Sequence, residues 1–319
     1  KIKAKVIDIK EETPSTKSII LKPNRLWKGF KPGQHCLLSF PINGKITGRY
    51  YSITSSPVDS NLKFTIKKQN GGIFSNYLHE NLQIGSVIEL ENPKGDFTIE
   101  KPEDENILFI AGGSGITPIY SILNSLDSTK VYNIHLLYFS IEESEIIFGK
   151  ELEEIKDKFK GIKLNFILTH EKNEKFKNGF LSSELLNNLV PDFNERQIYL
   201  CGPESLQISA EALLPDKKIH KEVFKIFQIK PSDNKEVNIQ LNKSGKTLTF
   251  KGDKSLLDEL EENGVYPLHG CRSGICHTCV CTKVSGTTKN LLTGETSSGG
   301  NELIQLCSTI AYEDTELEL

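Results

Sequence analysis

Apolar and polar residues alternate in short runs through the first hundred residues. The runs KAKVIDI, KSIILK, CLLSF, KFTIKK and SVIEL have the period of two that is typical of β-strands. Turn-forming sequences such as PGQ, NGK, NGG and NPKGD separate them. This pattern predicts an antiparallel β-barrel domain over residues 1–101.

The period changes after residue 101. ILFIA (107–111) has the composition of a buried strand, and the helix expected after it places Ile119, Ile122, Leu123 and Leu126 at helical spacing. The runs IHLLYF, KLNFIL and IYLC continue as strands, with helices expected around 142–158, near 181–189 and from 204. Such alternation predicts a Rossmann-like α/β domain over residues 102–229, with a parallel sheet covered on both faces.

A third domain is expected at the C-terminal end. KPSDNK is polar and contains proline, so residues 230–236 read as a linker. VNIQL and TLTF flank a Ser-Gly turn, and the helix SLLDELEEN ends at Gly264, a residue suited to follow a helix. A cysteine-rich loop and further short strands complete a small α+β domain over residues 237–319.

Composition narrows the class of protein. The chain has 319 residues, 25% of them charged, and a net charge of −3, which argues against a general nucleic-acid binder. No apolar run approaches the ~20 residues that cross a bilayer, and the first residues lack the apolar core of a signal peptide. We therefore expect a soluble cytoplasmic protein.

The cysteines carry the strongest chemical signal. In the motif Cys271-x4-Cys276-x2-Cys279, three cysteines lie close together, and 27 residues separate Cys279 from a fourth, Cys307. This is the spacing of plant-type [2Fe-2S] ferredoxins, in which three thiolates come from one loop and the fourth from a distant segment. Gly270 and Gly274 allow the loop to fold closely, so that the backbone N–H groups of residues 272–274 can point at the sulfides.

A zinc site is the alternative for four thiolates. Zinc modules usually contribute two pairs of ligands, whereas this set divides three and one, which favours iron and sulfide. His277 is expected to cover the cluster, because cysteine supplies all four ligands. Cys281 is expected to be an ordinary buried thiol on the next strand, and Cys36 and Cys201 are likewise expected to supply no ligand.

Two segments of the first domain indicate a flavin site. Arg49-Tyr50-Tyr51-Ser52 offers a cation and an aromatic ring, although a strand end with an exposed arginine would read the same way. Gly71-Gly72-Ile73-Phe74-Ser75 opens a helical stretch, and a glycine pair at a helix N-terminus exposes N–H groups to a phosphate.

Two segments of the second domain indicate a nucleotide site. The loop from Gly112 to Pro118, GGSGITP, follows a strand and opens a helix, with Thr117 suited to the N-cap and Pro118 to the first turn. Cys201-Gly202-Pro203 ends a later strand of the same sheet, where such sheets bind ligands. A plain turn between strand and helix is the alternative for this second segment.

Together these motifs carry a family resemblance. R-x-Y-S, G-G-x-x-S, G-G-S-G-I-T-P and C-G-P, in this order, resemble the ferredoxin–NADP reductase superfamily. With a plant-type ferredoxin domain, which implies a β-grasp fold, after them, the chain looks like the reductase components of bacterial oxygenases. Its tail from Cys271 to Cys307 looks closest to reductases that serve membrane fatty-acid desaturases.

The resemblance implies a route for electrons from NADH or NADPH through FAD and a [2Fe-2S] cluster to an oxygenase, a desaturase or a similar redox protein. A stand-alone diaphorase or flavin reductase, or a flavoprotein with a zinc-bound docking module, stays open as an alternative. The resemblance assigns no acid–base pair, but it implies that Ser52, Cys201 and Glu222 lie near the contact between flavin and nicotinamide. The remaining flavin and nucleotide residues that it implies are Arg49, Tyr51, Ile66, Lys67, Gly72, Ile73, Phe74 and Ser75 for the flavin, and Gly113, Gly115, Thr117, Cys201 and Gly202 for the nucleotide.

Two features refine these expectations. Relatives that use NADPH often carry an arginine where this chain reads Phe139-Ser140-Ile141-Glu142-Glu143, and acidic residues there would repel a 2′-phosphate, which favours NADH. Residues 237–319 carry 7 Lys and Arg against 11 Asp and Glu, a net charge of −4. We expect this acidic surface to dock a basic partner, or simply to be solvated; its acidic side chains include Glu259, Glu261, Glu262, Glu313, Asp314, Glu316 and Glu318.

Overall fold

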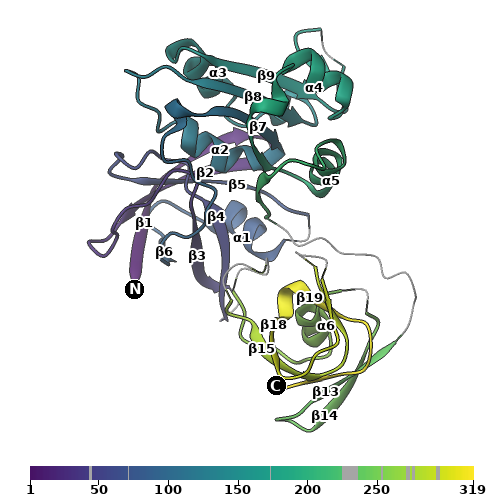
Figure 1. Cartoon of the computed structure of the whole chain (residues 1–319). Helices are drawn as coiled ribbons and strands as arrows, with labels where there is room; N and C mark the ends of the chain where they lie inside the picture. Colours follow the sequence, from purple (N-terminus) through teal and green to yellow (C-terminus); the bar gives the residue numbers. More distant parts are fainter. Residues whose placement is uncertain are drawn as a thin grey trace. The chain divides into compact units, whose positions relative to one another are not determined.

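The computed structural model divides into two compact units, Lys1–Glu222 and Val223–Leu319 (Figure 1). It describes residues 1–42, 45–70, 72–172, 174–224, 236–252, 254–270, 274, 277–291 and 295–319, and for Lys45 and Ile73 the backbone alone. The predicted linker at 230–235, the ligands Cys271 and Cys276, and Gly71 lie outside these residues.

The first half of unit 1 is an antiparallel barrel. Its six-stranded sheet has the order β4-β3-β6-β1-β2-β5, and a bridge between Ile53 and Phe64 joins the two outer strands. Phe74 and Leu78 of the single helix pack into the same core as the inward-facing strand residues. The elements are β1 (Ile2–Thr13), β2 (Thr16–Pro23), β3 (His35–Ile42), β4 (Lys45–Ser52), β5 (Leu62–Lys67), α1 (Ile73–Asn81) and β6 (Val87–Leu90).

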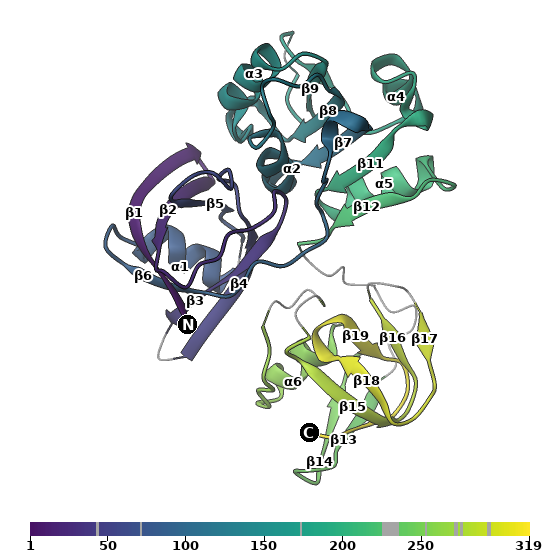
Figure 2. The ribbon, with the colours of Figure 1, turned by 60° about the vertical axis from the view of Figure 1, so that its left-hand side comes forward.

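The second half of unit 1 is a parallel sheet covered on both faces, as predicted (Figure 2). Strand order is β10-β9-β8-β7-β11-β12; helices α2 and α3 pack on one face, and α4 and α5 on the other. Alternate residues of β7 explain the two faces, since Phe109 packs in the first core and Leu108 in the second. The elements are β7 (Asn106–Gly112), α2 (Ile116–Leu123), β8 (Asn133–Ser140), α3 (Gly149–Lys158), β9 (Ile162–Leu168), β10 (Lys177–Asn178), α4 (Ser183–Leu189), β11 (Gln197–Cys201), α5 (Glu204–Leu213) and β12 (Ile219–Glu222).

Unit 2 is a mixed sheet packed on one helix, with a second small sheet of order β17-β16-β19. The main sheet has the order β14-β13-β20-β15-β18, in which β13 and β20 run parallel. Ser255 caps the helix by accepting a hydrogen bond from the Asp258 N–H, and Gly264 follows it with φ +76°. The elements are β13 (Val237–Leu241), β14 (Lys246–Phe250), α6 (Leu256–Glu262), β15 (Val280–Ser285), β16 (Thr288–Asn290), β17 (Thr296–Ser297), β18 (Glu302–Gln305), β19 (Thr309–Ala311) and β20 (Thr315–Leu317).

Three local predictions in unit 1 need correction. Helix α2 ends at Leu123, so Leu126 packs against the core from the loop that follows it. The charged helix begins at Gly149 and not near residue 142, because a 3₁₀ turn at Glu143–Glu145 comes first. Thr117 is not the N-cap, which is Gly115; its hydroxyl lies inside the first turn and donates to the Ser114 carbonyl at 2.9 Å.

Candidate functional site

In the parallel sheet of unit 1, the chain adds strands on one side of β7 up to β10 and then on the other side from β11, so the direction of winding changes between β7 and β11. Ligands of open parallel sheets bind beyond the carboxyl ends of the strands at such a switch point. Gly112 ends β7 and Cys201 ends β11, and their strands pair directly, Ala111 opposite Cys201. The glycine loop and the Cys-Gly-Pro segment therefore meet at this switch point.

The two loops pack too closely for side chains. A Cβ atom on Gly115 would lie 2.1 Å from the Cys201 carbonyl oxygen, and one on Gly202 would lie 3.0 Å from the Gly112 nitrogen. Gly113 is required for another reason, because its φ of +52° is left-handed while no atom lies within 4 Å of its missing Cβ. Backbone therefore lines this edge and is accessible to a ligand.

Five polar side chains lie together where the barrel meets the sheet. His35 pairs with Ser52 across β3 and β4, and Cys201 pairs with Glu222 across β11 and β12. The Thr117 hydroxyl lies 3.4 Å from the Ser52 hydroxyl, and His35 Nδ1 lies 2.7 Å from Glu222 Oε1. The predicted residues Ser52, Thr117, Cys201 and Glu222 thus share one site.

This site is dry. Ser52, Cys201 and Glu222 are buried, and burial raises the pKa of both the Glu222 carboxyl and the Cys201 thiol. The nearby Glu222 charge raises the pKa of Cys201 further, so the thiol stays protonated. His35 and Ser52 act in the opposite direction and lower the pKa of Glu222.

The barrel side of the site carries an aromatic stack and a helix N-terminus. The Tyr51 ring is stacked on Phe74 with 6.0 Å between centroids, and Arg49 lies two residues earlier on β4, its Nη1 donating to the Gly48 carbonyl at 2.7 Å. Helix α1 starts after Gly72 with no acidic residue in its first turn and no side-chain cap. The backbone N–H groups of Ile73, Phe74 and Ser75 at such an end suit an anion.

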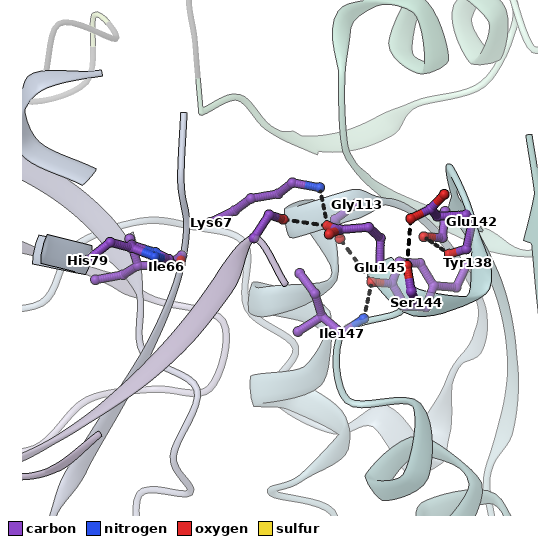
Figure 3. Close-up of polar contacts among 11 residues, drawn as sticks. Ile66, Lys67, His79, Gly113, Tyr138, Glu142, Ser144, Glu145 and Ile147 are labelled. Carbon is purple, nitrogen blue, oxygen red and sulfur yellow. Dashed lines mark hydrogen bonds and ion pairs between the residues drawn. The ribbon is translucent and has the colours of Figure 1, made fainter. Parts of the chain in front are cut away.

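Ile66 and Lys67, which are predicted to line the flavin, make contacts of their own within unit 1. The Ile66 side chain fills the barrel core, while its carbonyl accepts from His79 Nε2 at 2.8 Å. Lys67 Nζ crosses to the other half of the unit and lies 2.9 Å from Glu145 Oε2 (Figure 3). Lys67 therefore joins the barrel to the loop after β8.

The loop after β8 is held by a buried tyrosine. The Tyr138 hydroxyl donates to the Gly113 carbonyl at 3.2 Å and accepts from the Ile147 N–H at 3.1 Å, as Figure 3 shows. Burial raises the pKa of this phenol, so it remains a donor. One side chain thus ties the acidic loop to the glycine loop.

Acidic groups dominate the same loop. Glu142 accepts from the Ser144 hydroxyl at 2.5 Å, and Glu171 from the Glu143 N–H at 2.7 Å. Lys175 lies 2.9 Å from Glu143 and partly offsets its charge. Ile141, in the same loop, is 52% exposed.

Further contacts across unit 1 involve residues that the motifs did not identify. The Gly33 N–H donates to Ser121 Oγ at 3.0 Å, and Lys10 lies 2.9 Å from Glu151. Lys63 lies 4.8 Å from the centroid of the Tyr120 ring, and burial lowers its pKa. No motif marks these residues, or His35 and Glu145, because they act across the barrel–sheet boundary.

In unit 2 the structure brings together two of the four predicted cluster ligands. The Cys307 N–H donates to Cys279 Sγ at 3.5 Å, and the Gly274 N–H donates to Cys307 Sγ at 3.3 Å. Both thiols are buried, and N–H donors directed at sulfur suit thiolates that bind a cluster. These residues therefore fit a [2Fe-2S] group as far as the described part of the loop extends.

Two other residues near the cluster loop, Cys281 and His277, lie in the described part of unit 2. Cys281 is buried on β15 and packs in the core of unit 2. His277 is exposed, with φ +57°, and its Nδ1 lies 2.7 Å from Gln305 Nε2.

The acidic side chains of unit 2 differ in what they do. Glu259 is buried and accepts from the Gly252 N–H at 3.0 Å, so it is structural. Glu261 lies 3.4 Å from His269, and Glu262 lies 2.6 Å from Lys254 with 56% of its side chain exposed. Glu313 is exposed and accepts from the Thr287 hydroxyl at 2.5 Å.

Comparison with known proteins follows this division. Residues 3–99 match the oxidoreductase FAD-binding domain, residues 109–211 the oxidoreductase NAD-binding domain, and residues 239–311 the 2Fe-2S iron-sulfur cluster binding domain. In the part of the chain that the structure describes, no helix has the length and apolar character to cross a membrane.

Relatives cover nearly the whole chain. The 3-ketosteroid-9-alpha-monooxygenase ferredoxin reductase component of Mycolicibacterium smegmatis is 30% identical over 89% of this chain and 86% of its own length. An NADPH oxidoreductase of Mycobacterium tuberculosis is 28% identical over 100% of this chain and 84% of its own. The glycine betaine monooxygenase reductase subunit of Chromohalobacter salexigens is 27% identical over 88% and 85%.

The fold is also found among solved structures. Phthalate dioxygenase reductase, described as a modular structure for electron transfer from pyridine nucleotides to [2Fe-2S], covers 99% of this chain and 97% of its own with a TM-score of 0.67 at 19% identity.

Proposed function

Because the chain belongs to the ferredoxin–NADP reductase superfamily, in the group that joins FAD-binding, NAD-binding and [2Fe-2S] domains, we propose that it is the reductase of an oxygenase system. Members of this group are oxidoreductases that pass electrons from a nicotinamide nucleotide through FAD and the cluster. The observation that carries the proposal is the buried junction at which Ser52 of the barrel meets Thr117 of the glycine loop.

The flavin is assigned to the barrel side of this junction. Arg49 binds its diphosphate together with backbone N–H groups at the start of α1, which belong to Gly72, Ile73, Phe74 and Ser75. Tyr51 stacks on the ring system, and Ser52 donates a hydrogen bond to it. Ile66 contributes through its backbone, since its side chain fills the core, and the Lys67 stem lies alongside with its ammonium held by Glu145.

The nicotinamide nucleotide is assigned to the sheet side. Gly113, Gly115 and Thr117 bind it at the end of β7, while Cys201 and Gly202 position its nicotinamide at the end of β11. Burial excludes water from this junction, as hydride transfer requires. Bound flavin supplies the central chemistry, because it accepts a hydride and releases single electrons to the cluster.

We propose NADH as the preferred donor. The carboxylates Glu142 and Glu143 lie where a 2′-phosphate would need a cation, and Ile141 offers none. Lys175 and Lys67 are close but already pair with Glu143 and Glu145. One relative is named an NADPH oxidoreductase, so the opposite preference is a real alternative. Measuring kcat/KM with NADH and with NADPH tests the proposal, and a higher value with NADPH would refute it.

The cluster is assigned to Cys271, Cys276, Cys279 and Cys307. Cys307→Ser should lose or weaken the cluster bands to the red of the flavin, while NADH–ferricyanide activity at the flavin remains. Cys281→Ser, a buried thiol two residues beyond Cys279, is the matched control and should keep the full spectrum. Cluster absorbance at the wild-type level in Cys307→Ser would refute the ligand set.

The flavin assignment is tested by retention. Arg49→Ala should release FAD on desalting, because a charge-assisted phosphate contact is lost. Arg25→Ala, an exposed arginine of the same barrel, should retain it. Equal FAD content in the two variants would remove Arg49 from the site.

The acceptor is proposed to be an oxygenase, since several relatives are named as monooxygenase reductases. The resemblance of the tail to desaturase reductases extends the proposal to a membrane-bound desaturase, which a vesicle co-sedimentation assay with reconstituted desaturase would test. If the acidic face of unit 2 docks the partner, salt screens its charges. The rate of partner reduction should then fall as the salt concentration rises through ~0.15 M.

Glu262 and Glu313 are the residues with which to test that face, because Glu259 is structural. Glu262→Lys with Glu313→Lys should slow partner reduction and leave NADH–ferricyanide activity unchanged. Glu195→Lys, an exposed reversal in unit 1, is the control. Partner reduction that ignores both salt and these reversals would show that the acidic face is only solvated.

A further inference from the structure

The contact between His35 and Glu222 is a feature of the junction that the sequence motifs do not explain. Both side chains are 6% exposed, and their 2.7 Å contact links β3 of the barrel to β12 of the sheet. Among the described residues, neither His35 Nε2 nor Glu222 Oε2 has a hydrogen-bond partner. Burying two titratable groups this incompletely satisfied is costly, which indicates a role beyond packing.

The backbone fixes the imidazole firmly. The His35 N–H donates to the Lys94 carbonyl at 3.0 Å, and the Lys94 N–H returns a bond to the His35 carbonyl at 2.9 Å. Gly95 has φ +106°, and a Cβ there would lie 2.8 Å from the ring. The Tyr50 ring packs edge-on at 5.2 Å between centroids. The ring can therefore hold a carboxylate in one place.

We propose that His35 is a positioning residue that keeps Glu222 ionised and oriented at the hydride-transfer junction. This inference rests on the proposed function and adds a residue to it. A nicotinamide ring that gives up a hydride loses two electrons and one proton from C4 and becomes cationic. A fixed carboxylate beside that ring stabilises the positive charge as it develops.

Electrostatics agree with the geometry. Burial raises the pKa of Glu222, and His35 is the main influence that lowers it again. Removing His35 therefore shifts ionisation of Glu222 to higher pH. The other groups at the pair are the Cys201 thiol, kept neutral by burial, and Tyr50, whose hydroxyl lies 3.3 Å from Lys94 Nζ and 3.2 Å from Glu91.

Equilibrium binding to the holoenzyme tests the proposal without turnover. The probes are NAD⁺, whose ring is cationic, and tetrahydro-NADH, whose ring is neutral and unreactive. An ionised Glu222 favours NAD⁺ over the neutral probe, so the ratio of the two dissociation constants should report its charge across pH. In His35→Leu the pH at which this preference appears should rise by about one unit.

Two variants separate positioning from a structural effect. His35→Asn places an amide N–H near the position of Nδ1, so it should restore the wild-type midpoint to within about 0.3 pH units. Ser121→Ala removes another buried contact between barrel and sheet, its bond with Gly33, but no titratable group. It should lower thermal stability and leave the midpoint in place.

Stopped-flow flavin reduction by NADH supplies the kinetic arm. His35→Leu should reduce the rate about tenfold at neutral pH and recover at higher pH, while His35→Asn stays near wild type. A midpoint in His35→Leu equal to that of wild type, or a rate loss that Ser121→Ala reproduces, would overturn the proposal. Absence of flavin reduction by NADH in the wild type would instead overturn the proposed function.

Discussion

Two glycines of one loop allow the nucleotide site to be tested by a matched pair of alanine substitutions. Gly115 has ordinary helical dihedrals, φ −63° and ψ −9°, but its missing Cβ would lie 2.1 Å from the Cys201 carbonyl oxygen. Gly113 has φ +52°, but nothing lies within 4 Å of its missing Cβ. Gly115→Ala therefore introduces a steric clash without backbone strain, whereas Gly113→Ala introduces backbone strain without a clash.

The clash has a calculable size. Carbon and backbone oxygen do not approach below 3.0 Å, so Gly115→Ala must move α2 away from β11 by roughly 1 Å. Overpacking of this kind costs about 1–3 kcal/mol of unfolding free energy. A 1 Å displacement at a reacting centre can also cost about 10²-fold in rate. Gly113→Ala should cost only about 1–2 kcal/mol, the strain of a left-handed alanine, with a much smaller effect on rate.

Urea denaturation and stopped-flow flavin reduction measure the two quantities. We expect both variants to lose similar stability, while Gly115→Ala alone loses hydride-transfer rate by one to two orders of magnitude (about 10- to 100-fold). Equal rates in the two variants would mean that the approach of the glycine loop to Cys201 does not position the substrate.

Three further predictions follow from single sites. Ile141→Arg should raise kcat/KM for NADPH by roughly tenfold relative to NADH, because it places a guanidinium where the 2′-phosphate binds, and an unchanged ratio would place that phosphate elsewhere. Burial and the neighbouring Arg196 lower the pKa of His135 to about 4, so the unfolded chain binds the extra proton first and stability should fall as pH drops from 6.5 towards 4. His135→Leu should reduce the stability lost between pH 6.5 and pH 4 by about 1–3 kcal/mol in urea titrations, and an unchanged loss would assign acid sensitivity to other groups. Glu145→Gln should weaken the pair with Lys67 and lower thermal stability, whereas Glu154→Gln on the exposed face of α3 should not, as differential scanning calorimetry would show.

Local patterns were enough to predict much of this fold. Alternating strands and the strand–glycine–helix segments depend on neighbours in sequence, so the barrel, the parallel sheet and the glycine loop were predicted. Strand β12 was not, because Ile219–Glu222 is short and polar and forms only by pairing with β11. The start of α3 was misplaced because a 3₁₀ turn precedes it and the Ile147 N–H bonds to Tyr138, a contact that helical periodicity does not reveal.

The site residues also differ in whether local sequence was enough to predict them. Ser52, Thr117 and Cys201 belong to motifs, Glu222 is implied by the family resemblance, and the structure brings the four together. The role of His35 could not be predicted from the sequence because it depends on strand register. His35 lies beside Glu222 only through the pairing of β3 with β4 and of β11 with β12. A histidine at the start of a strand, read alone, is more often a packed core residue.

The contacts across unit 1 differ from one another in a way that bears on mechanism. Those nearest the junction, from Ser52 to Thr117 and from His35 to Glu222, are buried, whereas Lys10 is 54% exposed in its pair with Glu151. Salt screens exposed charges strongly and buried ones weakly, so rising ionic strength weakens the periphery and spares the junction. Hydride transfer should therefore keep its rate under salt that slows the docking proposed for unit 2. That difference follows from burial alone and makes salt a way to separate the two electron-transfer steps.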